Sequence, residues 1–265
     1  MKKEFNYGLA DIKAMLANLP IASTLGWQDI QLRYRRSKIG PFWITISSGI
    51  MIMMIGLIFG QALGNPMDEY LPYLSVGIIF WGYISTSINE GCMAFIESAG
   101  MIRQLSIPLS IYPTKVIYRN IVILGHNIIL IPLVLLWTDT TLTLRVFLIL
   151  PGFILLAINI FWLSVVLGVL CTRFRDMTTI VTNILQVFFY LTPIIWQPNS
   201  LSPRTSSLLV NPNPFYHLLE IVRAPILGEI PAMLSWQVSF SLAILGMVFL
   251  FFFFGKFKDR IAYWV

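Results

Sequence analysis

Six long apolar runs, separated by short polar stretches, dominate the pattern of this chain. They cover residues 42–64, 70–97, 116–137, 146–171, 178–197 and 233–255. Each run is long enough to cross the roughly 30 Å hydrocarbon core of a bilayer as an α-helix. Lipid offers the backbone no hydrogen-bonding partners, so a spanning segment of this kind has to be helical. The pattern predicts an all-α integral membrane protein with six transmembrane helices in a single domain, residues 1–265.

The polar stretches between the runs differ sharply in positive charge. Fifteen of the eighteen Lys and Arg residues lie before the first run, after the second, after the fourth or after the sixth, and three lie on the other side. The positive-inside rule therefore predicts that both chain termini are cytoplasmic. Anionic head groups of the membrane lipids attract basic residues placed in this way. The net charge of +6 is thus explained by the membrane, and no nucleic-acid partner is expected.

The chain offers few motifs that could carry out chemistry. Its composition, 57% hydrophobic and 11% charged residues, is that of a membrane protein. It contains no GxxxxGK(S/T) phosphate loop and none of the HExxH, GxSxG or CxxC motifs. Cys92 and Cys171 show neither a disulfide framework nor a metal-binding spacing. We therefore expect no catalytic site, cofactor or metal in this chain. Any directional work has to draw its energy from another subunit or from an ion gradient.

The N-terminal residues 1–40 form a predicted cytoplasmic interface arm. A helix can begin at Pro20 and continue to Lys38, because proline suits the start of a helix. The apolar residues of this helix form two narrow stripes, Ile21, Leu25 and Leu32 on one side and Trp27, Ile30 and Tyr34 on the other. Two stripes favour a helix held between the membrane surface and a protein partner over a helix that contacts lipid alone.

Three further segments lie outside the runs. Residues 98–115 are short, amphipathic and interrupted by Pro108 and Pro113, which we expect to end helices. This segment is either a plain loop or a contact surface for a soluble motor. Residues 198–232 are rich in proline yet too apolar for a solvated loop, which predicts short re-entrant or interfacial helices at the outer face. Residues 256–265 form a predicted cytoplasmic tail.

The fifth run carries polar residues at helical spacing. Thr179, Asn183, Gln186 and Tyr190 share one face, and Phe189 and Trp196 lie in its outer half. The first run has a weaker counterpart, made of Trp43, Thr45, Ser48 and Phe59. Carboxamides that face lipid are costly, so the stripe faces either a hydrogen-bonded seam between helices or a channel wall. A dimer seam beside a pore satisfies both readings.

Charged residues inside the second and third runs form a further candidate cluster. Glu90 falls between the depths of Arg119 and His126 if both runs are helical, at 1.5 Å per residue. An intramembrane ion pair among these residues is the expected arrangement, and a proton relay is the alternative. Normal function in a Glu90→Gln variant would exclude the relay.

Four short motifs occur in a recognisable order. They are DIQLRYRRSKIGPFW at residues 29–43, FRD at 174–176, TPI at 192–194, and NP at 211–212 followed by Arg223. Together they resemble motifs of the permeases of bacterial polysaccharide ABC exporters, the Wzm/KpsM-like family that moves O-antigen, capsule or teichoic chains. The four motifs span nearly the whole chain.

The resemblance implies a half-transporter that forms a homodimer in the bacterial inner membrane and binds two copies of a separate ATPase, which holds the ATP and Mg. The arm helix and residues 98–115 would contact that ATPase, through Trp27, Arg103 and Gln104. The first and fifth helices would line the channel for a lipid-linked polysaccharide, and the short outer helices of residues 198–232 would form its gate. Arg33, Arg35 and Arg36 would attract the lipid diphosphate, or serve only as the usual basic anchor. The alternatives are an ABC permease for a small lipid or drug, and a membrane-embedded glycosyl- or acyltransferase.

Overall fold

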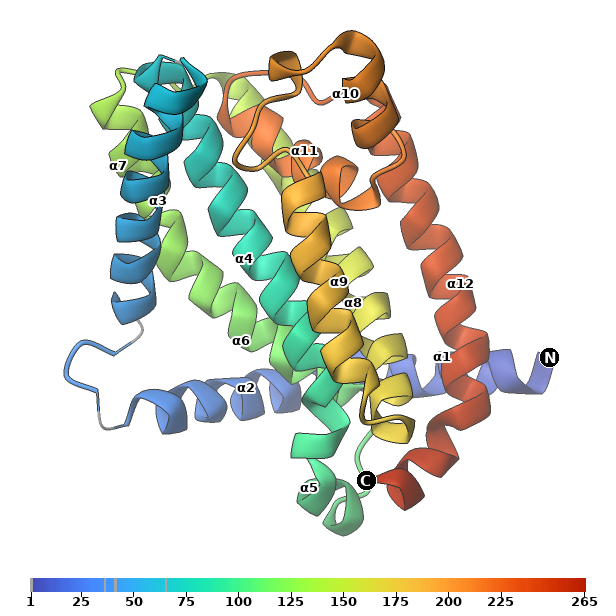
Figure 1. Ribbon diagram of the computed structural model, residues 1–265. Coiled ribbons are helices and arrows are strands. Elements are labelled where there is room, and N and C mark those ends of the chain that lie inside the picture. The colour runs from blue at the N-terminus through green and yellow to red at the C-terminus, as the bar shows by residue number, and fades with distance from the viewer. Residues whose placement is uncertain (1, 36, 41, 65) are drawn as a thin grey trace.

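The computed structural model describes residues 2–35, 37–40, 42–64 and 66–265, and within these ranges all regular structure is helical (Figure 1). Arg36, one of the arginines predicted to contact diphosphate, lies outside the described residues. Among the described residues, five helical segments are long and apolar enough to cross a membrane. They are α3 (Phe42–Leu63), α4 (Met67–Glu97), α6 with α7 (Ile111–Ile128 and Leu130–Trp137), η1 with α8 (Leu144–Leu148 and Ile149–Arg173), and α12 (Met233–Trp264).

The fifth apolar run departs most from expectation. It forms α9 (Met177–Leu191), which has 15 residues and ends at Leu191 rather than at residue 197. The residue before a proline is pushed out of the helical region, and Thr192, which precedes Pro193, has φ −82° and ψ 133°. The chain from Thr192 to Gln197 continues without a helix. The described part of the chain thus has five long apolar segments and one shorter apolar helix where six similar spans were expected.

Other helix boundaries also depend on proline. α6 ends at Ile128 because Pro132 has no N–H for the carbonyl group of Ile128, and α7 begins at Leu130. Pro113, which was expected to end a helix, lies instead in the first turn of α6, where a missing N–H is harmless. α12 continues to Trp264, so the predicted tail at residues 256–265 is largely helical.

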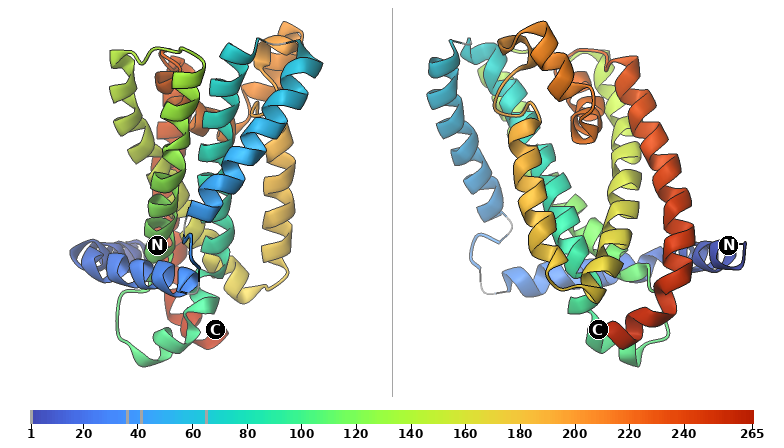
Figure 2. Two further views of the ribbon diagram at one scale, coloured as in Figure 1. Left: turned by 90° about the vertical axis from the view of Figure 1, so that its left-hand side faces the viewer. Right: turned by 45° about the vertical axis from the view of Figure 1, so that its right-hand side comes forward.

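α4 is the central helix of the bundle. In the most apolar 18-residue stretch of α4, 78% of the residues are buried, whereas in that of α3 only 17% are buried. α3, α6, α8 and α9 pack around α4, and α12 packs against α8 (Figure 2). The apolar side chains of α3 therefore face outward, as expected of a helix that contacts lipid or a second protein.

The arm consists of two helices, α1 (Lys2–Ala17) and α2 (Leu19–Tyr34), which lie across the lower ends of the upright helices (Figure 1). α2 packs on α6 and buries Ala22, Gly26 and Ile30. A Cβ atom on Gly26 would lie 2.8 Å from the Lys115 carbonyl oxygen, so the backbones approach closely there. Of the six residues in the two predicted stripes, this buried face contains Ile30 alone.

α1 is fastened to two other helices. It crosses α12 where Gly8 meets Gly255, and a Cβ atom on either glycine would collide with backbone atoms of the other helix. The buried carboxylate of Asp11 accepts hydrogen bonds from the Ser110 backbone N–H at 3.0 Å and hydroxyl at 2.6 Å, directly before α6. Lys258 of α12 lies 3.3 Å from the same carboxylate. Asp11 thus joins α1, α6 and α12.

The two ends of the bundle differ. α5 (Ala99–Gln104) lies at the end that carries the arm and the C-terminal residue. η2 (Pro198–Ser200), α10 (Pro203–Val210) and α11 (Pro214–Ile226) lie at the opposite end (Figures 1 and 2). Residues 198–232 therefore contain short helices, and the segments rich in Lys and Arg gather at the end with the arm.

Candidate functional site

The polar stripe of α9 lies on the outside of the single chain. Thr179, Asn183, Gln186 and Tyr190 are all exposed, and Tyr190 is 63% exposed. The opposite face of α9 buries Val181 and Leu185 toward the bundle. The stripe is therefore open to whatever surrounds the protomer. Because carboxamides are costly in lipid, this surface calls for a second protein copy or a water-filled path.

Aromatic residues extend this surface at the C-terminal end of α9. Phe189 is half-buried, with its ring centroid 6.0 Å from that of Trp81 and 5.3 Å from that of Tyr190. Trp196 lies in the irregular segment after α9 and donates from its indole nitrogen to the Tyr190 carbonyl oxygen at 3.0 Å. The C-terminal half of α9 thus presents one exposed ring backed by rings that are held by the bundle.

The corresponding residues of α3 divide into two groups. Trp43 and Phe59 are 59% and 39% exposed, and Ser48 is half-buried. Thr45 is buried, and its hydroxyl donates to the Asn127 side-chain oxygen of α6 at 3.1 Å. Thr45 therefore faces another helix of its own protomer, whereas Trp43 and Phe59 remain available at the surface.

A charge network joins the arm to the bundle at the other end. The Glu90 carboxylate of α4 lies 2.7 Å from Arg119 of α6 and 2.9 Å from Arg33 of α2. Asp29, one turn before Arg33, lies 3.0 Å from Arg119 and 3.3 Å from Lys115. Partial burial lowers the pKa of the Arg33 guanidinium. The hydrogen bond to Glu90 and the negative charge of that carboxylate outweigh burial, so the pKa of Arg33 is raised above its ordinary value. The network has three cations and two anions, and it fixes α2 to both α4 and α6.

The structure brings together only part of the expected ion-pair cluster. Glu90 and Arg119 meet, but His126 does not join them. The His126 Nδ1 atom lies 2.8 Å from the Val122 carbonyl oxygen, one turn earlier in its own helix, and the ring lies edge-on to Phe42. Asp29 and Lys115 were missed in the sequence analysis. The signal for them is the repeated four-residue spacing, Asp29 to Arg33 and Lys115 to Arg119, which puts each pair on one helical face.

The residues predicted to contact an ATPase lie at the arm end. Trp27 is 47% exposed on α2, and Gln104 is exposed at the end of α5. Arg103 is also exposed, and its guanidinium donates to the main-chain oxygen of Val265. Arg35, predicted to contact a diphosphate, is exposed just after α2. These side chains are accessible from the side of the bundle that carries α2 and α5.

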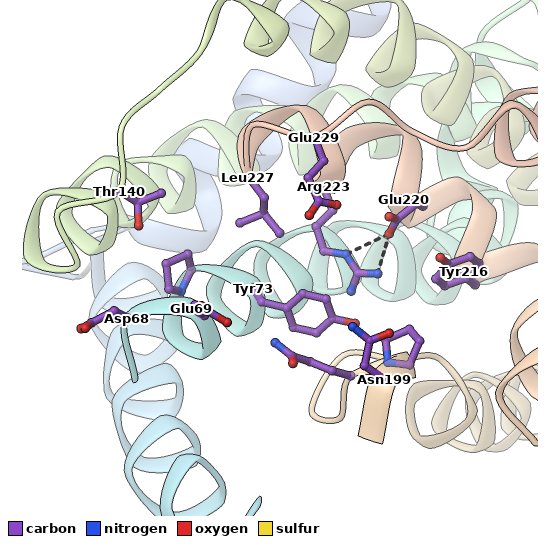
Figure 3. A pocket seen from close by; sticks show the side chains of 13 residues that line it. Asp68, Glu69, Tyr73, Thr140, Asn199, Tyr216, Glu220, Arg223, Leu227 and Glu229 are labelled. Carbon is purple, nitrogen blue, oxygen red and sulfur yellow. Dashed lines mark hydrogen bonds and ion pairs between the residues drawn. The ribbon is translucent and has the colours of Figure 1, made fainter. Parts of the chain in front are cut away.

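The end of the bundle opposite the arm holds a pocket of about 600 Å³, called the outer pocket, that the sequence analysis did not predict (Figure 3). Arg223 of α11 forms its rigid wall. The guanidinium donates to the Glu220 carboxylate at 2.6 Å and to the Pro193 carbonyl oxygen at 2.6 Å, and lies 4.1 Å from the centre of the Tyr73 ring. Although burial opposes its charge, Tyr73 and Glu220 raise the pKa of Arg223 above its ordinary value. Of the residues in this wall, the sequence analysis had singled out only Arg223, as the arginine that follows the NP motif.

The family of the chain follows from its sequence match. The family of ABC-2 type transporters matches residues 22–227, which is well over half of the chain. The chain belongs to the ABC-2 type transporter family. The matched ABC-2 region begins inside α2 and ends directly after α11, so it includes the charge network, the α9 stripe and most of the outer pocket. A transporter permease of this family is a multi-pass membrane protein.

Curated relatives of this ABC-2 chain carry a consistent name. An O-antigen export system permease protein, RfbA, of Myxococcus xanthus is 24% identical over 216 residues, covering 74% of this chain and 76% of the relative. An RfbA of Klebsiella pneumoniae is 23% identical over 272 residues, covering 99% of this chain and 98% of the relative. Another RfbA of Klebsiella pneumoniae is 24% identical over 231 residues, covering 83% and 82%.

Proposed function

We propose that this chain is the channel-forming permease subunit of an ATP-driven exporter that moves lipid-linked polysaccharide across the inner membrane of a bacterium. Two copies would assemble with two copies of a separate ATPase, which binds the ATP and Mg. Family membership and the O-antigen permeases among the relatives support the class of transport. The observation that carries the proposal is the exposed face of α9, where amides, hydroxyls and an aromatic ring follow one line.

This face suits a sugar polymer better than a lipid bilayer. Amides and hydroxyls exchange hydrogen bonds with sugar hydroxyl groups, and flat rings such as Tyr190 stack on the apolar faces of pyranose rings. A second copy of the chain would close the path by placing its own α3 and α9 opposite. The contacts have to be weak and repeated, because a tight site would stall a long polymer.

The arm end suits the motor. α2 is fixed to α4 and α6 through the charge network, so a push on the exposed Trp27 face would reach the central helix of the bundle. Arg103 and Gln104 on α5 offer a second contact at the same end. With this end in the cytoplasm, as the distribution of Lys and Arg favours, Arg35 would be placed to attract a lipid diphosphate. Arg33 is paired with Glu90, so its phosphate role is secondary.

Depletion of the protein in its host tests the proposal. Surface glycan is stained on intact cells, and lipid-linked glycan is extracted from the inner membrane and cytoplasm. We expect surface glycan to be lost while full-length lipid-linked chains accumulate inside. Normal surface glycan would favour a permease for a small lipid or drug, and loss of the polymer everywhere would favour an enzyme.

A Tyr190→Ala variant tests the conduit itself. We expect slower export of polymer with little change in basal ATPase activity of the complex, because Tyr190 is exposed and supports no core packing. Val187→Ala is the matched control, since Val187 is an exposed apolar residue of the same helix, 57% exposed. Equal export in wild type and Tyr190→Ala would refute a stacking surface on α9.

A further inference from the structure

The outer pocket is built by segments that are distant in the sequence. Its lining comes from the start of α4, the loop after α7, the segment around η2, and α11 with the residues after it. Figure 3 shows side chains from these segments around one space. The pocket volume of about 600 Å³ lies within the range of small-molecule sites, so it holds a ligand of a few sugar rings rather than a single ion.

The pocket wall is preorganised. Tyr73 donates from its hydroxyl to the Pro193 carbonyl oxygen at 2.8 Å, and Arg223 donates to the same oxygen while it stacks on the Tyr73 ring. Burial raises the pKa of Tyr216 to about 12, so this second tyrosine stays neutral and keeps its hydroxyl proton. The shared carbonyl oxygen and the stacking hold Tyr73 and Arg223 in position without a ligand, which lowers the entropic cost of binding.

Charge defines what the pocket accepts. Four carboxylates line it, those of Asp68, Glu69, Glu220 and Glu229, against the single cation Arg223, which is paired with Glu220. Asp68, Glu69 and Glu229 are exposed and present only hydrogen-bond acceptors. A ligand therefore has to offer donors, as sugar hydroxyl groups do, and carry no negative charge. Among the described residues, no group of carboxylates is arranged to hold a metal ion.

One irregular segment of the chain joins the end of α9 to the pocket. The irregular segment after α9 contributes Trp196, which donates to the Tyr190 carbonyl oxygen, and then Gln197, which lines the pocket. The same segment thus links the last residue of the polar stripe to the pocket wall.

We propose that the outer pocket is a glycan-binding site that takes two or three uncharged sugar units of the emerging polymer and excludes acidic sugars. This inference rests on the proposed function and adds a substrate class to it: a polymer of neutral or amino-substituted sugars. Asp68, Glu69 and Glu229 accept hydrogen bonds from sugar hydroxyls, and Asn199 and Tyr216 supply further polar contacts. Their combined negative charge repels uronic acids and phosphate-bearing units.

Calorimetry on the full-length protein in lipid nanodiscs, with its ATPase bound, tests the site. The probes are short fragments of the host's own surface polysaccharide, released without lipid, and a trigalacturonic acid as the acidic comparison. We expect saturable binding of the host fragments and binding at least about tenfold weaker for the acid. The double variant Asp68→Asn/Glu229→Gln removes two charged acceptors and should weaken binding of the host fragments about tenfold, while reducing the discrimination against the acid.

Asp139→Asn is the matched control. Asp139 is an exposed carboxylate of the neighbouring outer loop, outside the pocket, and its φ of 50° is one that asparagine adopts readily. The control should bind within about twofold of wild type. No binding to wild type, or equal binding by the double variant, would overturn the pocket assignment. Loss of surface glycan on depletion would still uphold the exporter in that case, whereas normal surface glycan would refute the exporter itself.

Discussion

The network around Glu90 makes a quantitative prediction about stability. Glu90→Gln keeps the shape of the side chain but removes the charge that faces Arg119, whose side chain is 6% exposed, and Arg33, whose side chain is 41% exposed. Removing one partner of a buried ion pair costs about 3–5 kcal/mol. Arg119 retains Asp29 at 3.0 Å, and the contact of Glu90 with the half-exposed Arg33 contributes little. We therefore expect a loss of about 2 kcal/mol in the free energy of unfolding.

Thermal unfolding of the purified protein in detergent measures this loss. The readout is the fraction of protein that remains monodisperse on size-exclusion chromatography after heating to each temperature. About 2 kcal/mol corresponds to a fall of roughly 4–8 °C in the midpoint for a chain of this size. Glu97→Gln is the matched control, since Glu97 is exposed and lies two turns further along the same helix, and it should melt within about 1 °C of wild type. A Glu90→Gln midpoint equal to that of the control would refute the reasoning. Normal export per folded molecule in Glu90→Gln would also exclude a proton relay through this carboxylate.

Three further predictions concern positions where the structure leaves little freedom. Gly255→Ala should destabilise the protein by about 1–3 kcal/mol and expose the arm to proteolysis, because its Cβ would meet the backbone of α1, whereas Gly125→Ala, with open space around it, should be neutral or slightly stabilising. Arg223→Lys should lower the thermal midpoint through loss of the guanidinium fork to Glu220 and Pro193, whereas Arg204→Lys on the exposed part of α10 should leave the midpoint unchanged. Asp11→Asn should cost about 1–2 kcal/mol, since it weakens the acceptor for the backbone N–H and hydroxyl of Ser110 and unpairs Lys258, and limited proteolysis of the arm would detect it.

The long helices were predictable because hydropathy and length are strong local signals. Residues 42–64 and 70–97 differ from α3 and α4 by only a few residues at their ends. The error at the fifth run had a local cause that was visible in the sequence. Thr192 before Pro193 should have ended the helix, but the apolar residues Ile194, Ile195 and Trp196 extended the hydrophobic run past it.

The arm was harder to predict because its packing depends on small residues. Ala22, Gly26 and Gly8 carry little hydrophobic weight, yet they allow α2 and α1 to approach α6 and α12 closely. A pattern that weighs hydrophobic side chains therefore points to the exposed stripes instead. The pairing of α1 with α12 joins residues about 250 positions apart, as between Tyr7 and Asp259, and no local signal reports such a contact.

The candidate sites also divide into one that local sequence signals predict and one that forms only on folding. The stripe on α9 was predictable because helical periodicity places its four residues on one face, although only the structure shows that the face is exposed. The outer pocket depends on four segments that meet only after folding. Tyr73, Asn199 and Glu229 carry no motif, so the sequence contained no signal that joined them.

The irregular segment after α9 has a consequence for how the protein is made. Its carbonyl oxygens obtain hydrogen bonds from side chains: Tyr70 donates to Ile195 at 2.6 Å, and Tyr73 and Arg223 donate to Pro193. Arg223 lies 30 residues beyond Pro193, so it is added to the chain only after α9 has been synthesised. A 15-residue apolar helix followed by unpaired carbonyls is a poor substrate for stable insertion by itself. We therefore expect stable insertion of α9 to depend on the arrival of α11, and a chain truncated before Arg223 should leave α9 poorly inserted in the bilayer.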